Sequence, residues 1–209
     1  MSATRYPIPA AHHRVELTID RSRFLCTVVH AATTEDAQQF MRDMNAEFPD
    51  ATHNCWAYVI GAPGSTGQVG MSDDGEPHGT AGRPMLTVLL HSGLGDIAVV
   101  VTRWFGGTKL GTGGLVKAYS SAVQLALESL PRAERVELVE CSLRVGYADI
   151  SAMQQLFPQF EVQVIDDRYE TDVQYMMKLP RERLDAFREA VQNATRGQSQ
   201  VLANDDEAR

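Results

Sequence analysis

The sequence predicts an α+β protein with two domains. Its 209 residues, 44% of them hydrophobic, suffice for one large or two small hydrophobic cores. Fourteen of the sixteen glycines lie between Gly61 and Gly114, so backbone freedom is concentrated in the first part of the chain. The last third reads as strand, helix, strand, strand, helix, strand, which is the ferredoxin-like order. We therefore expect an α/β domain over residues 1–133 and a small ferredoxin-like domain over residues 134–209.

Four strands are expected in the first domain. Residues 14–20 and 23–31 are rich in β-branched side chains and surround the polar pair Arg21–Ser22, which predicts a hairpin. Residues 52–61 follow as a third strand whose side chains alternate between two faces. Residues 96–105 are a continuous apolar run, which is typical of a central strand buried on both faces.

Three helices are expected between and after these strands. Residues 33–48 have apolar side chains at helical spacing, a threonine as cap and acids in the first turn. Pro84 suits the start of a short apolar helix over residues 85–91. Residues 113–130 form a long amphipathic pattern that a proline ends. The glycine-rich segment 61–83 is expected to be a loop.

The second domain is expected to complete the βαββαβ order. A turn over Asp166–Arg168 would join its two middle strands, and the DDEA sequence near the end would form a solvated acidic tail. The elements are expected at 135–146 (strand), 149–157 (helix), 160–166 (strand), 170–179 (strand), 181–194 (helix) and 198–203 (strand).

The charge and the cysteines exclude several classes of protein. The net charge is -8, with 11 basic against 13 acidic residues up to Arg135 and 8 against 14 after it, so the nets are -2 and -6. This balance argues against a nonspecific nucleic-acid binder, although a local basic patch stays open. The three cysteines are far apart, which suggests neither a disulfide framework nor a cysteine zinc site. No segment has the length of a membrane span or a signal peptide, so we expect a cytoplasmic protein.

The segment SDDGEPHGTAGRP, residues 72–84, carries the densest polar chemistry. One interpretation is a divalent-metal site, although the acid spacing is not that of an EF-hand. Another is a demanding turn, in which Gly75 and Pro77 set the bends and the acids cap backbone amides. A third is direct ligand contact, because long loops in compact domains are usually functional or disordered. The residues concerned are Asp73, Asp74, Glu76, His78, Thr80 and Arg83.

The segment TRWFGGTKLGTGG, residues 102–114, runs from a strand through a glycine loop into a helix. Free amides at a helix N-terminus present partial positive charge to an anion. The alternative is that the glycines only let the strand turn sharply. The segment is not a Walker A motif, because Thr112 stands where its lysine is required. The candidate anion-binding residues are Arg103, Gly106, Gly107, Lys109, Gly111 and Gly113.

The triplet His53-Asn54-Cys55 contains the residue types of a cysteine-protease triad. On a strand, however, His53 and Cys55 are about 6.5 Å apart along one face, beyond the reach of a nucleophile and its base. Cysteine-protease chemistry is therefore not expected. His53 alone would line a pocket if the glycine loops fold back over this strand end.

Four segments together resemble the IMPACT/YigZ family: SRFLC, PDATHNCWAYVIG, SDDGEPHGTAGRP and VVVTRWFGGTKLGTGGLVKAYSSAV. They cover most of residues 21–127. The C-terminal segment is similar to the small extra domain of the bacterial members. The resemblance implies an N-terminal domain like the second domain of a small-subunit ribosomal protein, with a left-handed βαβ crossover.

The resemblance also implies a function in translation. Eukaryotic relatives carry an additional RWD domain and regulate the stress response of translation initiation by competing for the activator of an initiation-factor kinase. We expect no such domain in this chain, so the resemblance does not by itself assign the same role to it.

The leading hypothesis is a cytoplasmic regulatory or binding protein, not an enzyme, linked to translation or stress. Its partner would be RNA or a ribosome-associated protein, and the chain would be a monomer or a weak homo-oligomer. The alternative is a hydrolase or phosphoryl-transfer enzyme, in which the paired acids hold Mg²⁺ and the second glycine loop binds phosphate. No other cofactor is expected.

Overall fold

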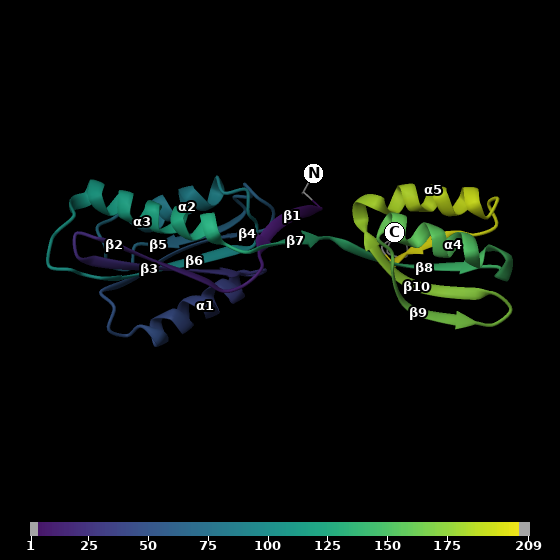
Figure 1. The fold of residues 1–209 in the computed structure, drawn as a ribbon, viewed down its shortest axis with the longest axis horizontal. Helices are drawn as coiled ribbons and strands as arrows, with labels where there is room; N and C mark the ends of the chain where they lie inside the picture. The colour runs from purple at the N-terminus through teal and green to yellow at the C-terminus, as the bar shows by residue number, and fades with distance from the viewer. Residues whose placement is uncertain (1–3, 205–209) are drawn as a thin grey trace. The chain divides into compact units, whose positions relative to one another are not determined.

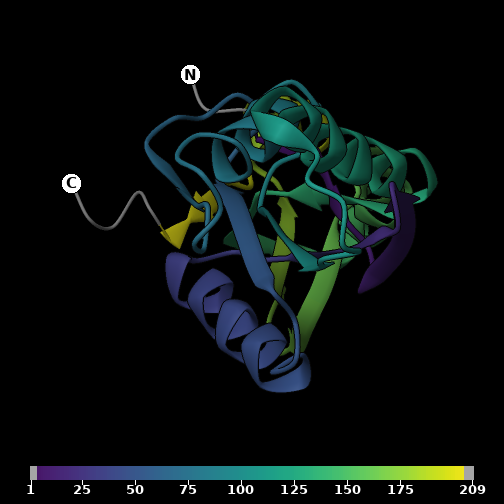
Figure 2. The same ribbon diagram turned by 90° about the vertical axis from the view of Figure 1, so that its left-hand side faces the viewer.

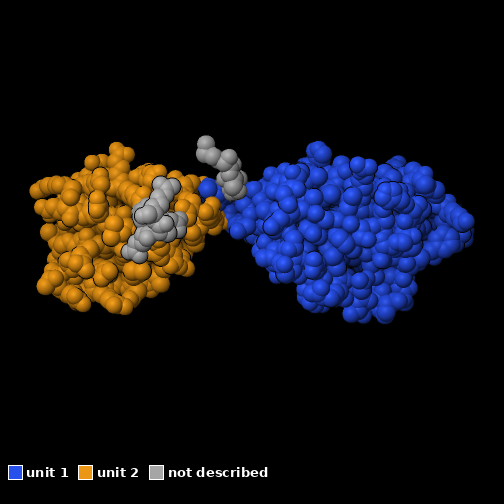
Figure 3. Space-filling model, turned by 180° about the vertical axis from the view of Figure 1, so that it is seen from behind, with its two compact units in different colours: residues 1–135 blue, residues 136–209 orange. Residues whose placement is uncertain are grey.

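The computed structural model describes residues 4–204, which form two compact units. Unit 1 comprises Met1–Arg135 and unit 2 comprises Val136–Arg209 (Figure 3). The sequence analysis expected the division between residues 133 and 134. The expected acidic tail lies outside the described residues.

Unit 1 is built on a five-stranded sheet in which all neighbouring strands run antiparallel. The strand at its centre, β6, is buried from its first residue to Arg103, as the apolar run predicted. A continuous apolar strand is stable there because both of its faces are covered. In the order of the sheet, the strands are β2 (His13–Ile19), β3 (Ser22–His30), β6 (Ile97–Trp104), β4 (His53–Ile60) and β5 (Gln68–Ser72).

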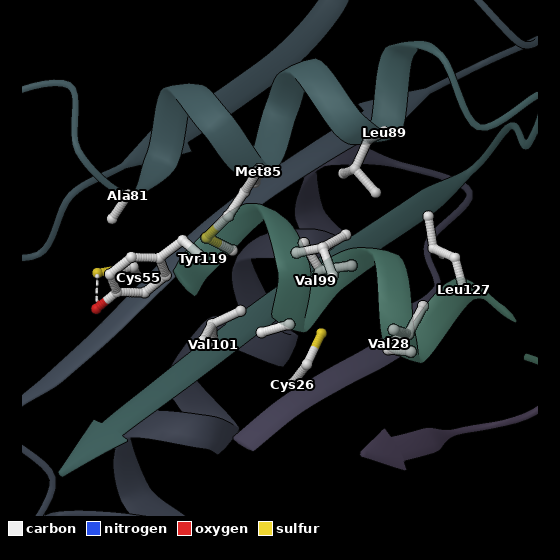
Figure 4. Packing of buried hydrophobic residues seen from close by; sticks show 14 of the residues in the cluster. Cys26, Val28, Cys55, Ala81, Met85, Leu89, Val99, Val101, Tyr119 and Leu127 are labelled. Carbon is white, nitrogen blue, oxygen red and sulfur yellow. Dashed lines mark hydrogen bonds between the residues drawn. The ribbon is translucent and has the colours of Figure 1, made fainter. Parts of the chain in front are cut away.

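Helices cover both faces of this sheet. Helix α1 (Thr34–Glu47) lies on one face, and α2 (Gly82–Leu90) and α3 (Gly111–Ser129) lie on the other (Figures 1 and 2). The larger core fills the space between the sheet and the α2–α3 pair, where Met85, Tyr119 and Val99 point toward one another (Figure 4). A smaller core lies beneath α1. A threonine caps helix α1 as expected: Thr33 precedes its first residue and forms a capping box with Asp36.

The hairpin between β2 and β3 turns one residue earlier than expected. The two turn residues are Asp20 and Arg21, with φ of 46° and 66°, whereas Ser22 already belongs to β3. Two successive positive φ angles match the twist of a tight hairpin, and aspartate tolerates them better than most residues.

The expected loop over residues 61–83 contains a strand, β5, that the sequence analysis missed. It pairs with β4 in register, with Gly70 opposite Tyr58. A Cβ at Gly70 would come within 2.4 Å of the Tyr58 ring, so the tyrosine side chain lies directly over this glycine. Glycine is uncommon in strands and favours a loop prediction. The sequence alone therefore does not show that Gly70 lies in a strand opposite an aromatic ring.

The expected pattern also missed a two-stranded sheet formed by β1 (Arg5–Pro9) and β7 (Arg132–Val136). Both strands meet at Asp96, which is fully buried. Its carboxylate accepts hydrogen bonds from the Tyr6 hydroxyl at 2.8 Å and the Gly61 amide at 2.8 Å, and pairs with Arg135 at 2.5 Å. One buried acid thus joins the first strand of the unit to its last.

We expect Tyr6→Phe to lower the free energy of unfolding of unit 1 by about 1–2 kcal/mol, because buried Asp96 loses one donor. The matched control is Tyr58→Phe, since the Tyr58 hydroxyl makes no hydrogen bond to another residue within 4–204, and a change within about 0.5 kcal/mol is expected. Urea unfolding followed by tryptophan fluorescence measures both. Equal effects of the two variants would contradict the assigned role of Asp96.

Unit 2 has the predicted ferredoxin-like fold. Its antiparallel sheet has the order β11-β8-β10-β9, with the helices packed on one face. The core of the unit includes Phe157, Tyr175 and Phe187. The elements are β8 (Leu138–Val145), α4 (Ile150–Leu156), β9 (Gln163–Tyr169), β10 (Val173–Pro180), α5 (Leu184–Ala194) and β11 (Val201–Ala203).

The expected turn over Asp166–Arg168 is wrong. These residues lie within β9 and pair with β10, and the chain reverses at Glu170–Asp172 instead. Strand β9 is an edge strand whose residues are all exposed. Charged residues are common on edge strands, where they discourage pairing with other chains, although the same residues favour turns elsewhere.

Candidate functional site

Two segments of unit 1 that are rich in glycine meet at one cavity of about 370 Å³. The first segment contributes Glu76 and Pro77, and the second contributes residues from Arg103 to Leu115. The start of β4 completes the wall. The lining residues are Thr52, His53, Glu76, Pro77, Arg103, Phe105, Lys109, Leu110, Gly111, Thr112 and Leu115.

A buried ion pair lies at this cavity. Glu76 is 8% exposed and Arg103 is 5% exposed, and Glu76 Oε1 lies 2.5 Å from Arg103 Nη1. The same oxygen accepts a hydrogen bond of 2.8 Å from the Tyr119 hydroxyl of α3. A buried charge is tolerated only when it is paired and hydrogen-bonded, and both conditions are met here.

The rest of the Arg103 guanidinium packs among aromatic rings. It lies 5.4 Å from the centre of the Phe24 ring and 5.7 Å from that of Phe105. Its Nη2 is 3.4 Å from the Ser22 hydroxyl, whereas its Nε is buried without a hydrogen-bond partner in the described chain. Arg103 is therefore mainly the counter-charge of Glu76, and its Nε is left without a partner.

His53 lies beside this pair at the start of β4. Its Nδ1 is 2.7 Å from the carbonyl oxygen of Asp74, and its Nε2 is 3.9 Å from Glu76 Oε2. A carbonyl only accepts hydrogen bonds, so Nδ1 carries the proton and holds the ring in one orientation. The folded-back loop thus places His53 at the cavity.

The N-terminus of α3 opens at the same cavity. No side chain caps it, and its first turn contains no acid. Lys109 is exposed just before the helix. The glycines here have specific tasks: Gly107 and Gly111 have φ of 90° and 71°, and Gly106 packs directly against the backbone of Arg21.

Asp73 and Asp74 hold backbone in place. The Asp73 carboxylate accepts hydrogen bonds from the amides of Gly79, Ala81 and Gly82, so it caps the start of α2. Burial opposes its ionisation, but these hydrogen bonds outweigh the burial and lower the pKa of Asp73. Asp74 accepts a hydrogen bond of 2.6 Å from the Asn54 amide. This is the loop-shaping role that the turn interpretation gave the acids.

The structure brings some of the candidate residues to the cavity and leaves others outside it. Those that line the cavity are His53, Glu76, Arg103, Lys109 and Gly111. His78 is exposed and 3.8 Å from Asp73, Thr80 donates to the carbonyl of Pro77, and Arg83 is exposed on α2. Those outside the lining are Asp73, Asp74, His78, Thr80, Arg83, Gly106, Gly107 and Gly113.

Sequence reasoning missed Tyr119 and Phe105. Tyr119 fits the apolar face of a helix, which describes its ring but not its hydroxyl. Burial and the neighbouring Cys55 and Glu76 raise the pKa of Tyr119, so it stays a neutral donor. Phe105 is 47% exposed, a signal that appears only once the strand is known to end at Trp104.

Cys55 is not a nucleophile in this arrangement. Its sulfur lies 2.9 Å from the carbonyl oxygen of Asp73. It is also 3.3 Å from the Tyr119 hydroxyl (Figure 4). Burial raises the pKa of the Cys55 thiol, which keeps it protonated. Among the described residues, no three His, Cys, Asp or Glu side chains gather closely enough to hold a metal ion.

The fold and this site define a two-domain α+β protein with a largely apolar cavity, which contains a buried ion pair, between two glycine-containing loops of its first domain. Residues 20–127 match the family model described as the Impact N-terminal domain, and residues 143–198 match the one described as a domain of unknown function, DUF1949. The chain belongs to the IMPACT family.

Several relatives illustrate the membership. The chain is 41% identical over 196 residues to the IMPACT family member YigZ of Escherichia coli (strain K12), covering 94% of this chain and 96% of that protein. It is 32% identical over 107 residues to Protein IMPACT of Oryctolagus cuniculus, and the match covers 50% of this chain and 33% of that protein. A solved structure described as the crystal structure of an hypothetical protein is 40% identical, with a TM-score of 0.68, and the match covers 97% of this chain and 98% of that one.

Within residues 4–204, none of the helices combines the length and the apolar character that a membrane span requires.

Proposed function

We propose that this chain is a cytoplasmic regulatory protein that acts by binding RNA, and that unit 1 holds one RNA phosphate at the N-terminus of α3. The observation that carries the proposal is the uncapped start of α3, which opens at a cavity with exposed Lys109 beside it. Unpaired amides at a helix N-terminus favour an anion, and a lysine adds a full charge.

The surroundings favour RNA over a bare anion. Phe105 presents a half-exposed ring at the cavity, and single-stranded RNA is commonly held by stacking of its bases on such rings. The net charge of about -2 over the first 135 residues restricts binding to this local site and makes it sensitive to salt. A link to translation, which the family resemblance implies, is part of the same proposal.

Binding is favoured over hydrolysis or phosphoryl transfer by the position of the acids. A magnesium-dependent mechanism would use Asp73 and Asp74 to hold the ion or activate water. Both carboxylates instead accept hydrogen bonds from backbone amides. Their geometry supports the shape of the loop.

We expect Lys109→Ala to weaken the binding of a fluorescent octauridylate about tenfold at low salt, because a hydrogen bond to a charged group is lost. The slope of log K against log salt should fall in magnitude by about 0.7, the value for one phosphate contact on a single strand. Fluorescence anisotropy across a salt series measures both quantities.

The control is Lys117→Ala, which removes an exposed lysine within α3 that does not line the cavity. It should leave the affinity nearly unchanged. If the wild-type protein does not bind the oligonucleotide at low salt, or if the two lysine variants behave alike, the proposed function is wrong.

A further inference from the structure

Two hydrogen-bond acceptors lie side by side at the cavity without a donor. The first is His53 Nε2, which is an acceptor because Nδ1 carries the ring proton and donates a hydrogen bond to the carbonyl of Asp74. The second is Glu76 Oε2, 3.9 Å away. The hydrogen bonds that Glu76 receives from Arg103 and Tyr119 both go to Oε1, and no residue within 4–204 donates to Oε2.

Arg103 also lines the cavity and is 5% exposed. Its Nε has no acceptor in the described chain, but this atom is itself buried, so the groups open to a ligand are the two acceptors. Buried polar groups are rarely left unpaired, so two acceptors without a donor point to a ligand with hydroxyl groups, which can donate to both.

We propose that His53 and Glu76 at this cavity recognise the neighbouring 2′ and 3′ hydroxyls of a ribose. A cis-diol provides one O–H donor for His53 Nε2 and one for Glu76 Oε2. A 2′-deoxyribose end lacks one of these donors, and a 3′-phosphate end replaces the other with negative charge next to Glu76. Recognition of the 2′ hydroxyl is also how proteins distinguish RNA from DNA.

The size of the cavity and the anion site agree with one nucleotide. A volume of about 370 Å³ lies near the lower end of the range for small-molecule pockets, about 300–1,000 Å³. The α3 N-terminus at the mouth would hold the phosphate of the same nucleotide. This inference rests on the proposed function and specifies its ligand as the 3′ end of an RNA strand. A free ribonucleotide has the same diol and is the other source to test.

The test compares three fluorescent RNA octamers that differ only at the last nucleotide, which ends in a cis-diol, a 2′-deoxyribose or a 3′-phosphate. Anisotropy is measured at the same pH and salt concentration for all three octamers. The diol end should bind about tenfold or more tightly than either other end, because a hydrogen bond to a charged carboxylate is at stake. Unlabelled uridine monophosphate and its 2′-deoxy form compete in a parallel series.

The outcomes separate the two proposals. Equal affinity for all three ends overturns the diol inference and leaves RNA binding intact. If no octamer binds but the ribonucleotide binds more tightly than its deoxy form, the RNA proposal fails and the cavity recognises a free ribonucleotide. If nothing binds, both fail.

His53→Phe tests the residue itself, because it keeps a flat ring and removes Nε2. The variant should bind the deoxy-ended octamer as the wild type does, while the preference for the diol end falls to about twofold or less. A variant that merely folds poorly would lose affinity for both octamers. The ratio of the affinities for the diol-ended and the deoxy-ended octamer therefore reports on recognition of the diol. An unchanged ratio would overturn the assignment of His53.

Discussion

Glu76→Gln is expected to lower the free energy of unfolding of unit 1 by about 3–5 kcal/mol, because it leaves the Arg103 guanidinium buried without a counter-charge. Glutamine has nearly the shape of glutamate, so packing is kept and the charge is the variable. Both tryptophans of the chain, Trp56 and Trp104, lie in unit 1. Urea unfolding followed by their fluorescence therefore reports on this unit alone.

Glu16→Gln is the matched control. Glu16 also pairs with an arginine, Arg23, at 3.3 Å, but both side chains are 48% exposed. Exposed ion pairs are usually worth less than about 1 kcal/mol, so this variant should be nearly as stable as the wild type. If the two glutamine variants unfold at the same urea concentration, the buried Glu76–Arg103 pair contributes no more to the stability of unit 1 than an exposed ion pair does.

Gly106→Ala has the second largest expected effect, a loss of about 3 kcal/mol or more in the stability of unit 1. An added Cβ would lie 2.0 Å from the carbonyl carbon of Arg21 and 2.3 Å from the amide nitrogen of Ser22. These are backbone atoms of the β2–β3 hairpin, so no rotamer change relieves the overlap. Thermal unfolding followed by tryptophan fluorescence measures the loss.

Gly113→Ala provides the opposite expectation in the same glycine-rich segment. Gly113 lies in the first turn of α3, and an added Cβ would meet no atom within 4 Å. Alanine is a better helix former than glycine by up to about 1 kcal/mol, so this variant should be as stable as the wild type or more stable. Loss of stability in Gly113→Ala, or none in Gly106→Ala, would contradict the packing described here.

Much of the fold could be predicted from the sequence because its strongest signals are local. The apolar run of β6, the capping residues of α1 and the amphipathic pattern of α3 each describe one element without reference to any other. The βαββαβ order of unit 2 followed from the same periodicities. The failures include the short strands β1, β5 and β7. The strands β1 and β7 pair with each other across most of unit 1, whereas β5 pairs with the preceding strand β4 but carries a glycine opposite Tyr58.

The candidate site was predictable in outline and not in its details. The two segments that meet at the cavity could be identified in the sequence because glycines and charged residues are concentrated in them. Spacing gave no means to distinguish Glu76, which pairs with Arg103, from Asp73 and Asp74, which hold backbone amides. Tyr119 was hidden because a buried tyrosine and a functional tyrosine occupy the same position in a helical pattern.

The sequence by itself determined the class of fold, the extent of the main helices and the segments in which polar chemistry is concentrated. The tertiary structure alone decided which charges neutralise each other and which groups remain free at the cavity. Hydrophobic periodicity acts over a few residues and is written in the chain, whereas the pairing of Glu76 with Arg103, 27 positions apart, depends on how β4, β6 and α3 pack together. Burial then makes that pairing obligatory, because a charge removed from water requires a partner.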